Sequence, residues 1–504
     1  MDSAAAFSTK QKWIFAAATA VLWWAAGLSA ALFALGWIAF VPLFVVCGRL
    51  SPKQRFKWGY LTGWLSYFLI NWWVILSITR GAPAIGASPG AGFFLGVVGV
   101  ALIGIIQGLG VAIIALLWRR KMQSSLKVLL LWPLLIAGVW WGLEWLRAQS
   151  VLGHTWGALA YTQWSDLYSL QVVSVIGRNG LSAWCVWLAA MIALAWQLRK
   201  HRKMMFMAAG ILMIGFIGLH LWGAILYYEP LPKTGTSLKV LLIQTAVPSI
   251  SKTEEENNEA FEQASELTQK YFSHDRADLV IWPETTFSLG QGSADSIDDE
   301  TWVRQFSRAH NVPILSGTEH WTADRHLYNE ATLFSPDGQT QGNAKKWLVP
   351  FGERAPLGQY WSFLNQLAPQ PAIDPAAEKI PLELQVGNQT IKLGTLICFE
   401  SSFAAPFHRL HQRGAQLFAV LTNDGWFTGS AAPAAHAAMS AVAAVENRTA
   451  VVQAANGGYA FVVDSKGRFI GKSTFGKPQV LAVIVRVNNK FPLPFRERVR
   501  VRVY

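Results

Sequence analysis

Long apolar stretches in the first part of the chain constrain its fold more than any other feature. Five of them have about 20 residues, enough for a helix to cross the roughly 30 Å hydrocarbon core of a membrane. These five stretches lie at 58–79, 92–118, 127–146, 179–198 and 204–227. A longer run at 13–48 fits a hairpin of two spans that turns between Gly27 and Gly36. The sequence therefore predicts about seven membrane-crossing helices.

The first of these spans has a second interpretation, as a cleavable signal peptide. Lys10 and Lys12 precede the apolar run, which is the order of charged and apolar residues in such peptides. The run continues to Val46 without a clear cleavage site. Two membrane spans are therefore the favoured interpretation.

The charges of this first part predict its orientation in a membrane. Residues 1–228 hold 17 Lys and Arg but only three acids, Asp2, Glu144 and Asp166. Fourteen of the basic residues fall in alternate loops, and Lys and Arg accumulate in loops on the cytoplasmic side. We therefore expect a cytoplasmic N-terminus. An odd number of spans then places everything after Tyr228 on the outer side.

The second part, residues 229–504, has a different composition. Its 27 acids balance its 26 Lys and Arg, so the formal charge of +13 belongs to the first part. This balance argues against nucleic acid as a partner.

Short β-rich runs alternate with helical stretches from about Ser237 onward, which is typical of a layered α/β domain. The predicted strands lie at 238–247, 277–284, 311–320, 327–335, 389–400, 415–424 and 450–464. The predicted helices lie at 254–274, 299–309, 402–413 and 434–448.

Two stretches of this part, 356–374 and 419–436, mix Trp, Phe and Leu with Gly, Pro and Ala and lack clear periodicity. Surface loops are the common explanation. In a domain next to a membrane, mobile apolar lids that contact lipid or an acyl chain are the other explanation. The sequence leaves both open.

Three candidate catalytic residues stand at strand ends, where an α/β domain usually presents reactive groups: Glu284 in IWPETT, Lys345 in GNAKKWLVPFGE and Cys398 in GTLICFE. Each also has an ordinary structural explanation, as a solvated turn carboxylate, a surface ammonium and a buried core thiol. The other two cysteines, Cys47 and Cys185, fall within predicted spans, so neither can readily reach Cys398 to form a disulfide. A free thiol in an oxidising compartment is a hazard unless it is buried or used.

Together the three residue types suggest nucleophilic catalysis by a thiol. A cysteine with an ordinary pKa of about 8.5 is mostly protonated at neutral pH, so its attack on an ester or amide carbonyl needs a base or a nearby positive charge. A carboxylate can accept the proton, and an ammonium can stabilise both thiolate and oxyanion. No phosphate-binding glycine loop and no His cluster with ligand spacing appears, so we expect neither a metal nor another cofactor.

The order of these motifs resembles the carbon-nitrogen hydrolase (nitrilase) superfamily. The resemblance rests on WPE at 282–284, K-x-x-L-V-P-F-G-E at 345–353 and C-x-E at 398–400. Because a multi-span membrane domain precedes them, the chain is most similar to the apolipoprotein N-acyltransferase family of this superfamily. The likeness extends to EWLR at 144–147, NDGWF at 423–427 and AVENR at 444–448.

The resemblance implies three segments. Residues 1–228 would form a multi-span α-helical membrane domain, and residues 229–488 an α/β nitrilase-like catalytic domain built as an α-β-β-α sandwich. Residues 489–504 would form a basic tail that stays outside the membrane or lies on anionic headgroups. The implied location is the bacterial cytoplasmic (inner) membrane, with the N-terminus in the cytoplasm and the catalytic domain in the periplasm.

The resemblance also implies a role for five residues. Cys398 would be the nucleophile, Glu284 the general base, and Lys345 the group that stabilises oxyanion and thiolate. Glu353 would help to hold the lysine, and Glu400 matches the acidic residue two positions after the cysteine.

The family takes an acyl chain from a membrane phospholipid, typically phosphatidylethanolamine, onto the cysteine as a thioester. It then transfers the chain to the α-amine of diacylglyceryl-cysteine at the N-terminus of an apolipoprotein. A phospholipid, a diacylated apolipoprotein and the bilayer are therefore the expected partners. Two alternatives stay open: a divergent membrane-bound carbon-nitrogen hydrolase that acts as an amidase or acylates another amine, and a non-catalytic transporter or scaffold. The scarcity of paired charges within the spans argues against a transporter.

Overall fold

The computed structural model of the chain describes residues 7–118, 126–149, 153–230, 235–247, 254–290, 294–358, 360–368 and 371–488. The chain divides into two compact units, the first formed by Met1–Ile78 and Phe93–Glu229, the second by Thr79–Gly92 and Pro230–Tyr504. The predicted domain boundaries at 228/229 and 488/489 stay predictions. The predicted basic tail, 489–504, lies outside the described residues.

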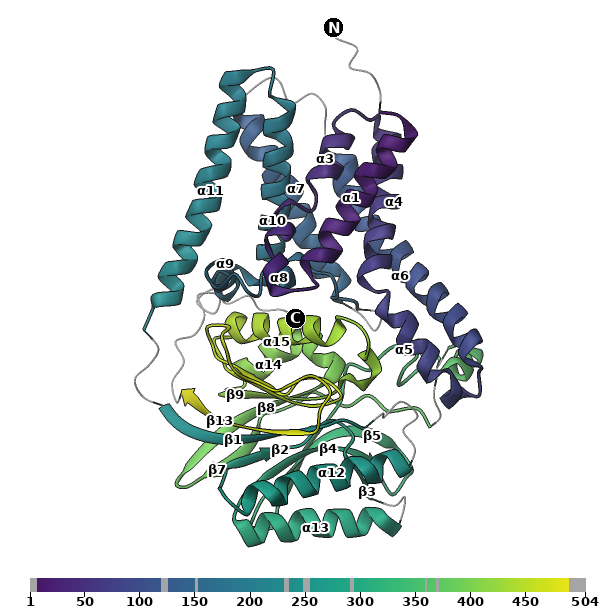
Figure 1. Cartoon of the computed structure of the whole chain (residues 1–504), viewed down its shortest axis with the longest axis vertical. Helices are drawn as coiled ribbons and strands as arrows, with labels where there is room; N and C mark the ends of the chain where they lie inside the picture. Colours follow the sequence, from purple (N-terminus) through teal and green to yellow (C-terminus); the bar gives the residue numbers. More distant parts are fainter. Residues whose placement is uncertain are drawn as a thin grey trace. The chain divides into compact units, whose positions relative to one another are not determined.

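The first unit is helical (Figure 1). The helices up to Tyr228 are α1 (Thr9–Ala26), η1 (Ala30–Leu32), α2 (Ala34–Ile38), α3 (Val41–Cys47), α4 (Pro52–Ile70), α5 (Trp73–Gly81), η2 (Ala82–Ile85), α6 (Pro89–Leu117), α7 (Leu126–Arg147), α8 (Leu159–Thr162), α9 (Leu167–Gln171), α10 (Val173–Gln197) and α11 (Arg202–Tyr228). Large apolar side chains are exposed along α6, α7 and α11, for example Phe94 at 67% and Ile214 at 74%. Such a surface is unusual in water and suits lipid.

The number of membrane-crossing helices is approximate. In the described part of the chain, four helical segments are long and apolar enough to cross a membrane, or five if the pair α4 and α5, bent by 53°, counts as one. The sequence predicted about seven. The first predicted span, α1, begins with the polar residues TKQK, which shorten its apolar part. It ends at Ala26, and α2 and α3 follow, so the chain turns where the hairpin was predicted.

The second unit contains a 13-stranded sheet in its described residues, with strands in the order β6-β5-β4-β2-β1-β10-β9-β8-β7 along its main path. The strands are β1 (Gly235–Thr245), β2 (Leu279–Ile281), β3 (Phe287–Gly290), β4 (Ile314–Trp321), β5 (Leu327–Phe334), β6 (Thr340–Ala344), β7 (Leu382–Val386), β8 (Gln389–Ile397), β9 (Leu417–Asn423), β10 (Val451–Asn456), β11 (Phe461–Val463), β12 (Phe469–Lys472) and β13 (Gln479–Asn488). The sheet folds back on itself, because Gln341 of β6 and Glu383 of β7 exchange two hydrogen bonds.

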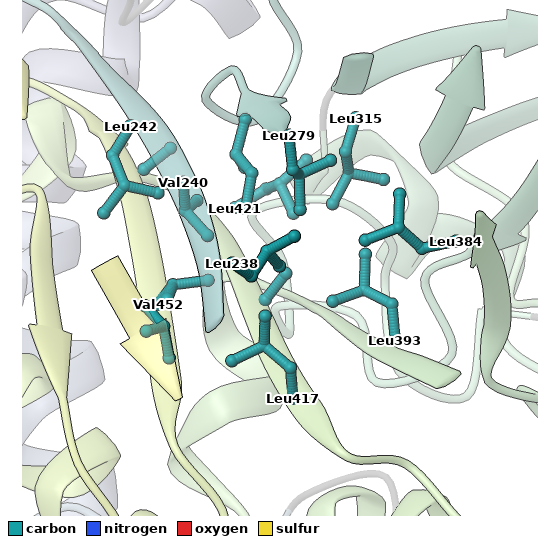
Figure 2. Packing of buried hydrophobic residues seen from close by; sticks show 14 of the residues in the cluster. Leu238, Val240, Leu242, Leu279, Leu315, Leu384, Leu393, Leu417, Leu421 and Val452 are labelled. Atoms are coloured by element: carbon teal, nitrogen blue, oxygen red, sulfur yellow. The ribbon is translucent and has the colours of Figure 1, made fainter. Parts of the chain in front are cut away.

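Apolar residues on alternate positions of the strands fill the space between the two halves of this sheet. Figure 2 shows side chains from β1, β2, β4, β7, β8, β9 and β10 that point toward one another. Leu238, Val240 and Leu242 of β1 belong to this core, whereas the alternate residues Leu241 and Ile243 face the other way. This alternation follows from the period of two in a strand.

Two pairs of helices cover the outer faces of the folded sheet. In Figure 1, α12 (Glu254–Phe272) and α13 (Ala294–His310) lie together along the β1 to β5 half. Helices α14 (Ala404–Gln412) and α15 (Ala432–Glu446) lie along the half that contains β8 and β9. The predicted helical region followed by an α-β-β-α sandwich is therefore confirmed. All predicted strands and helices of this unit are present with small shifts of their ends, and the sequence prediction omitted five strands, β3, β6, β7, β12 and β13.

Candidate active site

Strand direction brings the three candidate residues to one edge of the sheet. Strands β2, β1, β10, β9 and β8 are neighbours and run parallel. Strand β6 runs in the same direction as β2, because β2 is parallel to β4 and two antiparallel pairings separate β4 from β6. Glu284, Lys345 and Cys398 each follow the carboxyl end of one of these strands, so they meet at the same edge, where α/β domains usually bind ligands.

Glu284 lies in a tight turn after β2. The next residue, Thr285, has a positive φ of 49°, and the turn is held by hydrogen bonds with the backbone of Gly317. A Cβ atom at Gly317 would lie 2.5 Å from the Glu284 Cα and 2.5 Å from the Pro283 carbonyl oxygen, so only glycine fits there. The close approach of β4 thus fixes where the carboxylate points.

Lys345 is buried between two carboxylates. Its Nζ lies 3.0 Å from Glu284 Oε1 and 2.8 Å from Glu353 Oε1, and only 1% of the side chain is exposed. Burial alone would lower the pKa of Lys345, but the charges of Glu284 and Glu353 outweigh burial and raise its pKa well above the ordinary value. The two carboxylates therefore favour the charged ammonium form of Lys345.

Cys398 follows β8 directly and begins a short 3-10 helix, η4 (Cys398–Ser402), with a positive φ of 46°. A non-glycine residue in this region of φ carries backbone strain, which is common at functional sites. Burial and then the charge of Glu284 raise the pKa of its thiol, while Lys345 opposes them and lowers it. The resting group is therefore a thiol, and it needs a base to become a nucleophile.

Glu400 connects the segment after Lys345 to the strand that carries Cys398. Its Oε1 accepts hydrogen bonds from the backbone N–H groups of Lys346 and Trp347, at 2.7 and 3.3 Å. Its Oε2 accepts from the backbone N–H of Ile397 at 2.9 Å and pairs with the buried ammonium of Lys379. Glu400 is fully buried, so its contribution is to hold these two segments at a fixed distance.

Asn329 and Asn423 were missed by the sequence prediction. The Asn329 side-chain amide donates to Glu284 Oε1 at 2.7 Å and to Glu353 Oε1 at 3.3 Å. The backbone N–H of Asn423 donates to Glu284 Oε2 at 2.8 Å. Asn329 lies in the predicted strand LYNEATLFS, at a position that alternates with apolar residues and is buried in the structure. A buried amide needs hydrogen-bond partners, and its place in this pattern was the signal that could have found it.

The structure thus brings all five predicted site residues, Glu284, Lys345, Glu353, Cys398 and Glu400, into one buried cluster of hydrogen bonds and charges. The thiol of Cys398 interacts electrostatically with a carboxylate, which can accept its proton, and with an ammonium, which can stabilise a developing oxyanion. In the described ranges, no group of three or more His, Cys, Asp and Glu residues could hold a metal ion.

Two family models match the chain. The model "Carbon-nitrogen hydrolase" matches residues 242–488, so this part of the chain is a carbon-nitrogen hydrolase domain with a nitrilase-like fold. The model "Apolipoprotein N-acyltransferase N-terminal domain" matches residues 16–191 of the helical unit.

Curated apolipoprotein N-acyltransferases are similar to this chain over most of its length. An apolipoprotein N-acyltransferase of Geobacter metallireducens is 30% identical over 474 residues, which cover 90% of this chain and 85% of that protein. One of Chlorobaculum tepidum is 25% identical over 494 residues, with 90% and 86% covered. A solved carbon-nitrogen hydrolase of Helicobacter pylori G27 is 15% identical, with a TM-score of 0.40, and covers 49% of this chain and 89% of that one. The chain belongs to the apolipoprotein N-acyltransferase family.

Proposed function

We propose that this chain moves an acyl chain from a membrane phospholipid, through a thioester on Cys398, to the N-terminal α-amine of diacylglyceryl-cysteine in apolipoproteins. Membership of the family supports acyl transfer in lipoprotein maturation. The observation that carries the assignment of residues is the buried ammonium of Lys345, which contacts the proposed base Glu284 at 3.0 Å and acts electrostatically on the thiol of Cys398.

In the first half of the reaction, Glu284 accepts the thiol proton of Cys398 as its sulfur attacks the ester carbonyl carbon of the phospholipid. The carbonyl oxygen becomes an oxyanion, which the Lys345 ammonium stabilises. When the tetrahedral intermediate collapses, the ester C–O bond breaks. The departing alkoxide takes the proton from Glu284 and leaves as the hydroxyl of a lysophospholipid, and the acyl chain stays on sulfur as a thioester.

In the second half, the α-amine of the apolipoprotein attacks the thioester carbonyl and passes a proton to Glu284. The new oxyanion occupies the same place beside Lys345. Its collapse breaks the C–S bond, and the thiolate of Cys398 takes the proton back from Glu284. The enzyme returns to its starting state with an amide formed and no cofactor consumed.

If a phospholipid is the acyl donor, the transfer should require the ester bond of that lipid. Purified protein in vesicles of phosphatidylethanolamine with a labelled acyl chain should move the label onto the N-terminus of a synthetic diacylglyceryl-cysteine peptide, with one lysophospholipid released per amide. Mass spectrometry of peptide and lipid measures both products. Vesicles of ether-linked lipid, which have no ester to break, are the matched control.

Release of free labelled fatty acid without acylated peptide would instead indicate hydrolysis, and the alternative of a divergent amidase would replace the proposal. Transfer of the label to other amines and not to the peptide would indicate a different acceptor.

We also propose that the protein lies in the bacterial inner membrane with its N-terminus in the cytoplasm and its catalytic domain in the periplasm. The distribution of Lys and Arg among the loops supports this orientation. Protease added to spheroplasts should then digest a tag inserted in the exposed β7–β8 turn at Gly387, and should spare a tag at the N-terminus. The reverse pattern would overturn the orientation.

A further inference from the structure

A chain of polar groups lies against the backbone of the proposed nucleophile and has no role in the two half-reactions. The His436 ring, on α15, has its Nδ1 atom 3.0 Å from Asp424 Oδ1 and its Nε2 atom 2.6 Å from Ser401 Oγ. The same Nε2 lies 3.3 Å from the carbonyl oxygen of Cys398. All of these groups are almost completely buried, with His436 exposed by 1% and Asp424 by 0%.

A count of hydrogens assigns the charge of the ring. When Ser401 donates its single hydroxyl hydrogen to the Cys398 carbonyl oxygen, at 2.8 Å, its Oγ faces His436 as an acceptor. The Cys398 oxygen is an acceptor as well, and on the other side of the ring the Asp424 carboxylate is a third. Both ring nitrogens therefore need a hydrogen, which only the imidazolium has.

Two further observations agree with a charged ring. Burial alone would lower the pKa of His436, but the charge of Asp424 and the hydrogen bond with it outweigh burial and raise the pKa above its ordinary value. In the described residues, Asp424 Oδ2 has no hydrogen-bond partner, so this buried carboxylate depends on its contacts at Oδ1. A buried carboxylate without compensation would be costly.

The hydrogen bonds to the carbonyl oxygen of Cys398 act on a strained part of the backbone. Cys398 has a φ of 46°, and a strained residue keeps its conformation only when its surroundings hold it there. Ser401 and His436 both bond to its carbonyl oxygen and so oppose a rotation of the peptide that would move the thiol. The same segment that supplies Asp424 also holds the base, because the adjacent Asn423 N–H donates to Glu284.

We propose that His436 is a positioning residue of the reaction: held as an imidazolium by Asp424, it fixes the strained turn of Cys398 in the orientation that attack requires. The pair of Asp424 and His436 thus couples the turn that carries Cys398, after β8, to the end of β9, where Asn423 holds the base Glu284. This inference rests on the proposed function, since it needs Cys398 to be the nucleophile.

The test measures the single-turnover rate at which a phospholipid acylates the full-length protein in vesicles. His436→Leu should acylate about 10- to 100-fold more slowly, because a charge-assisted bond and the placement of a reacting group are lost. The concentration of lipid that gives half the maximal rate should not change. His436→Gln keeps an N–H donor near the Nε2 position and should recover part of the rate. Asp424→Asn should be slow, and the double variant Asp424→Asn/His436→Leu no slower than His436→Leu alone.

The controls separate this inference from the proposed function. If the wild type forms no thioester on Cys398, the proposed function fails; if it does and His436→Leu acylates at the wild-type rate, only the inference fails. The inference would also be overturned if the rate losses of Asp424→Asn and His436→Leu were fully additive in the double variant. Two residues that act as one unit have effects that are not additive. His411→Gln, at a buried histidine on α14, is the matched control and should keep the wild-type rate. Melting temperatures identify any variant that does not fold, and the near-isosteric Asp424→Asn and His436→Gln then carry the comparison.

Discussion

Replacement of Cys398 by alanine should abolish both the acyl-enzyme and the triacylated product. A thioester needs a thiol, and Cys398 supplies the thiol of the described site. The expected result is a complete loss of labelled protein in a denaturing gel and of triacylated reporter lipoprotein by mass spectrometry. Cys398 is 7% exposed, and the change removes only its sulfur atom. Because the change in volume is this small, the fold should tolerate it.

The chain offers a matched control for this variant. Cys185 is also a buried free thiol, but it lies on α10 in the helical unit. Cys185→Ala should leave the thioester and the product intact. Triacylation that persists in the Cys398→Ala protein, in cells with no other such enzyme, would contradict the assignment of the nucleophile.

Replacement of Lys345 by methionine should have the second largest effect, on both activity and stability. The variant loses the ammonium that stabilises the oxyanion, and loss of one such group typically slows a reaction about 10²- to 10³-fold. It also leaves the carboxylates of Glu284 and Glu353 buried without their cation, which should lower the free energy of unfolding by about 3 to 5 kcal/mol.

Two measurements separate these effects. Single-turnover acylation gives the loss of rate, and thermal unfolding in detergent gives the loss of stability. The additional change Glu353→Gln removes one of the two uncompensated charges, so it should restore part of the stability and none of the rate. Lys392→Met, at an exposed lysine on the strand that carries Cys398, should change neither. A Lys345→Met protein that acylates at the wild-type rate would contradict the proposed role.

Local patterns in the sequence predicted most of the fold. Alternating apolar residues located β1, β5, β8 and β9, because each of these strands buries one face in the core between the sheets. Strands β3, β6 and β12 are four or five residues long and have too few apolar residues for a periodic signal. Strand β13, QVLAVIVRVN, has a readable pattern and was simply omitted.

The arrangement of the site depends on contacts that no local pattern contains. The sequence predicted Glu284, Lys345 and Cys398 as candidates from their residue types and from the motifs around them. It did not predict that Asn329 would bridge two carboxylates, or that Lys379 would pair with Glu400, because β-sheet pairing brings those residues together from distant parts of the chain. The roles of the five site residues therefore stay predictions for the variants above.

The pairing of β1 with β13 has a consequence for how the protein is made. Strand β1 follows directly after the last helix of the first unit, yet it pairs over ten positions, from Gly235 to Gln244, with the final described strand. Until β13 has been synthesised, one side of β1 has most of its backbone N–H and C=O groups unpaired. Folding of the second unit thus has to wait for its last described strand, so the unfinished chain is the form most exposed to proteases and most in need of chaperones.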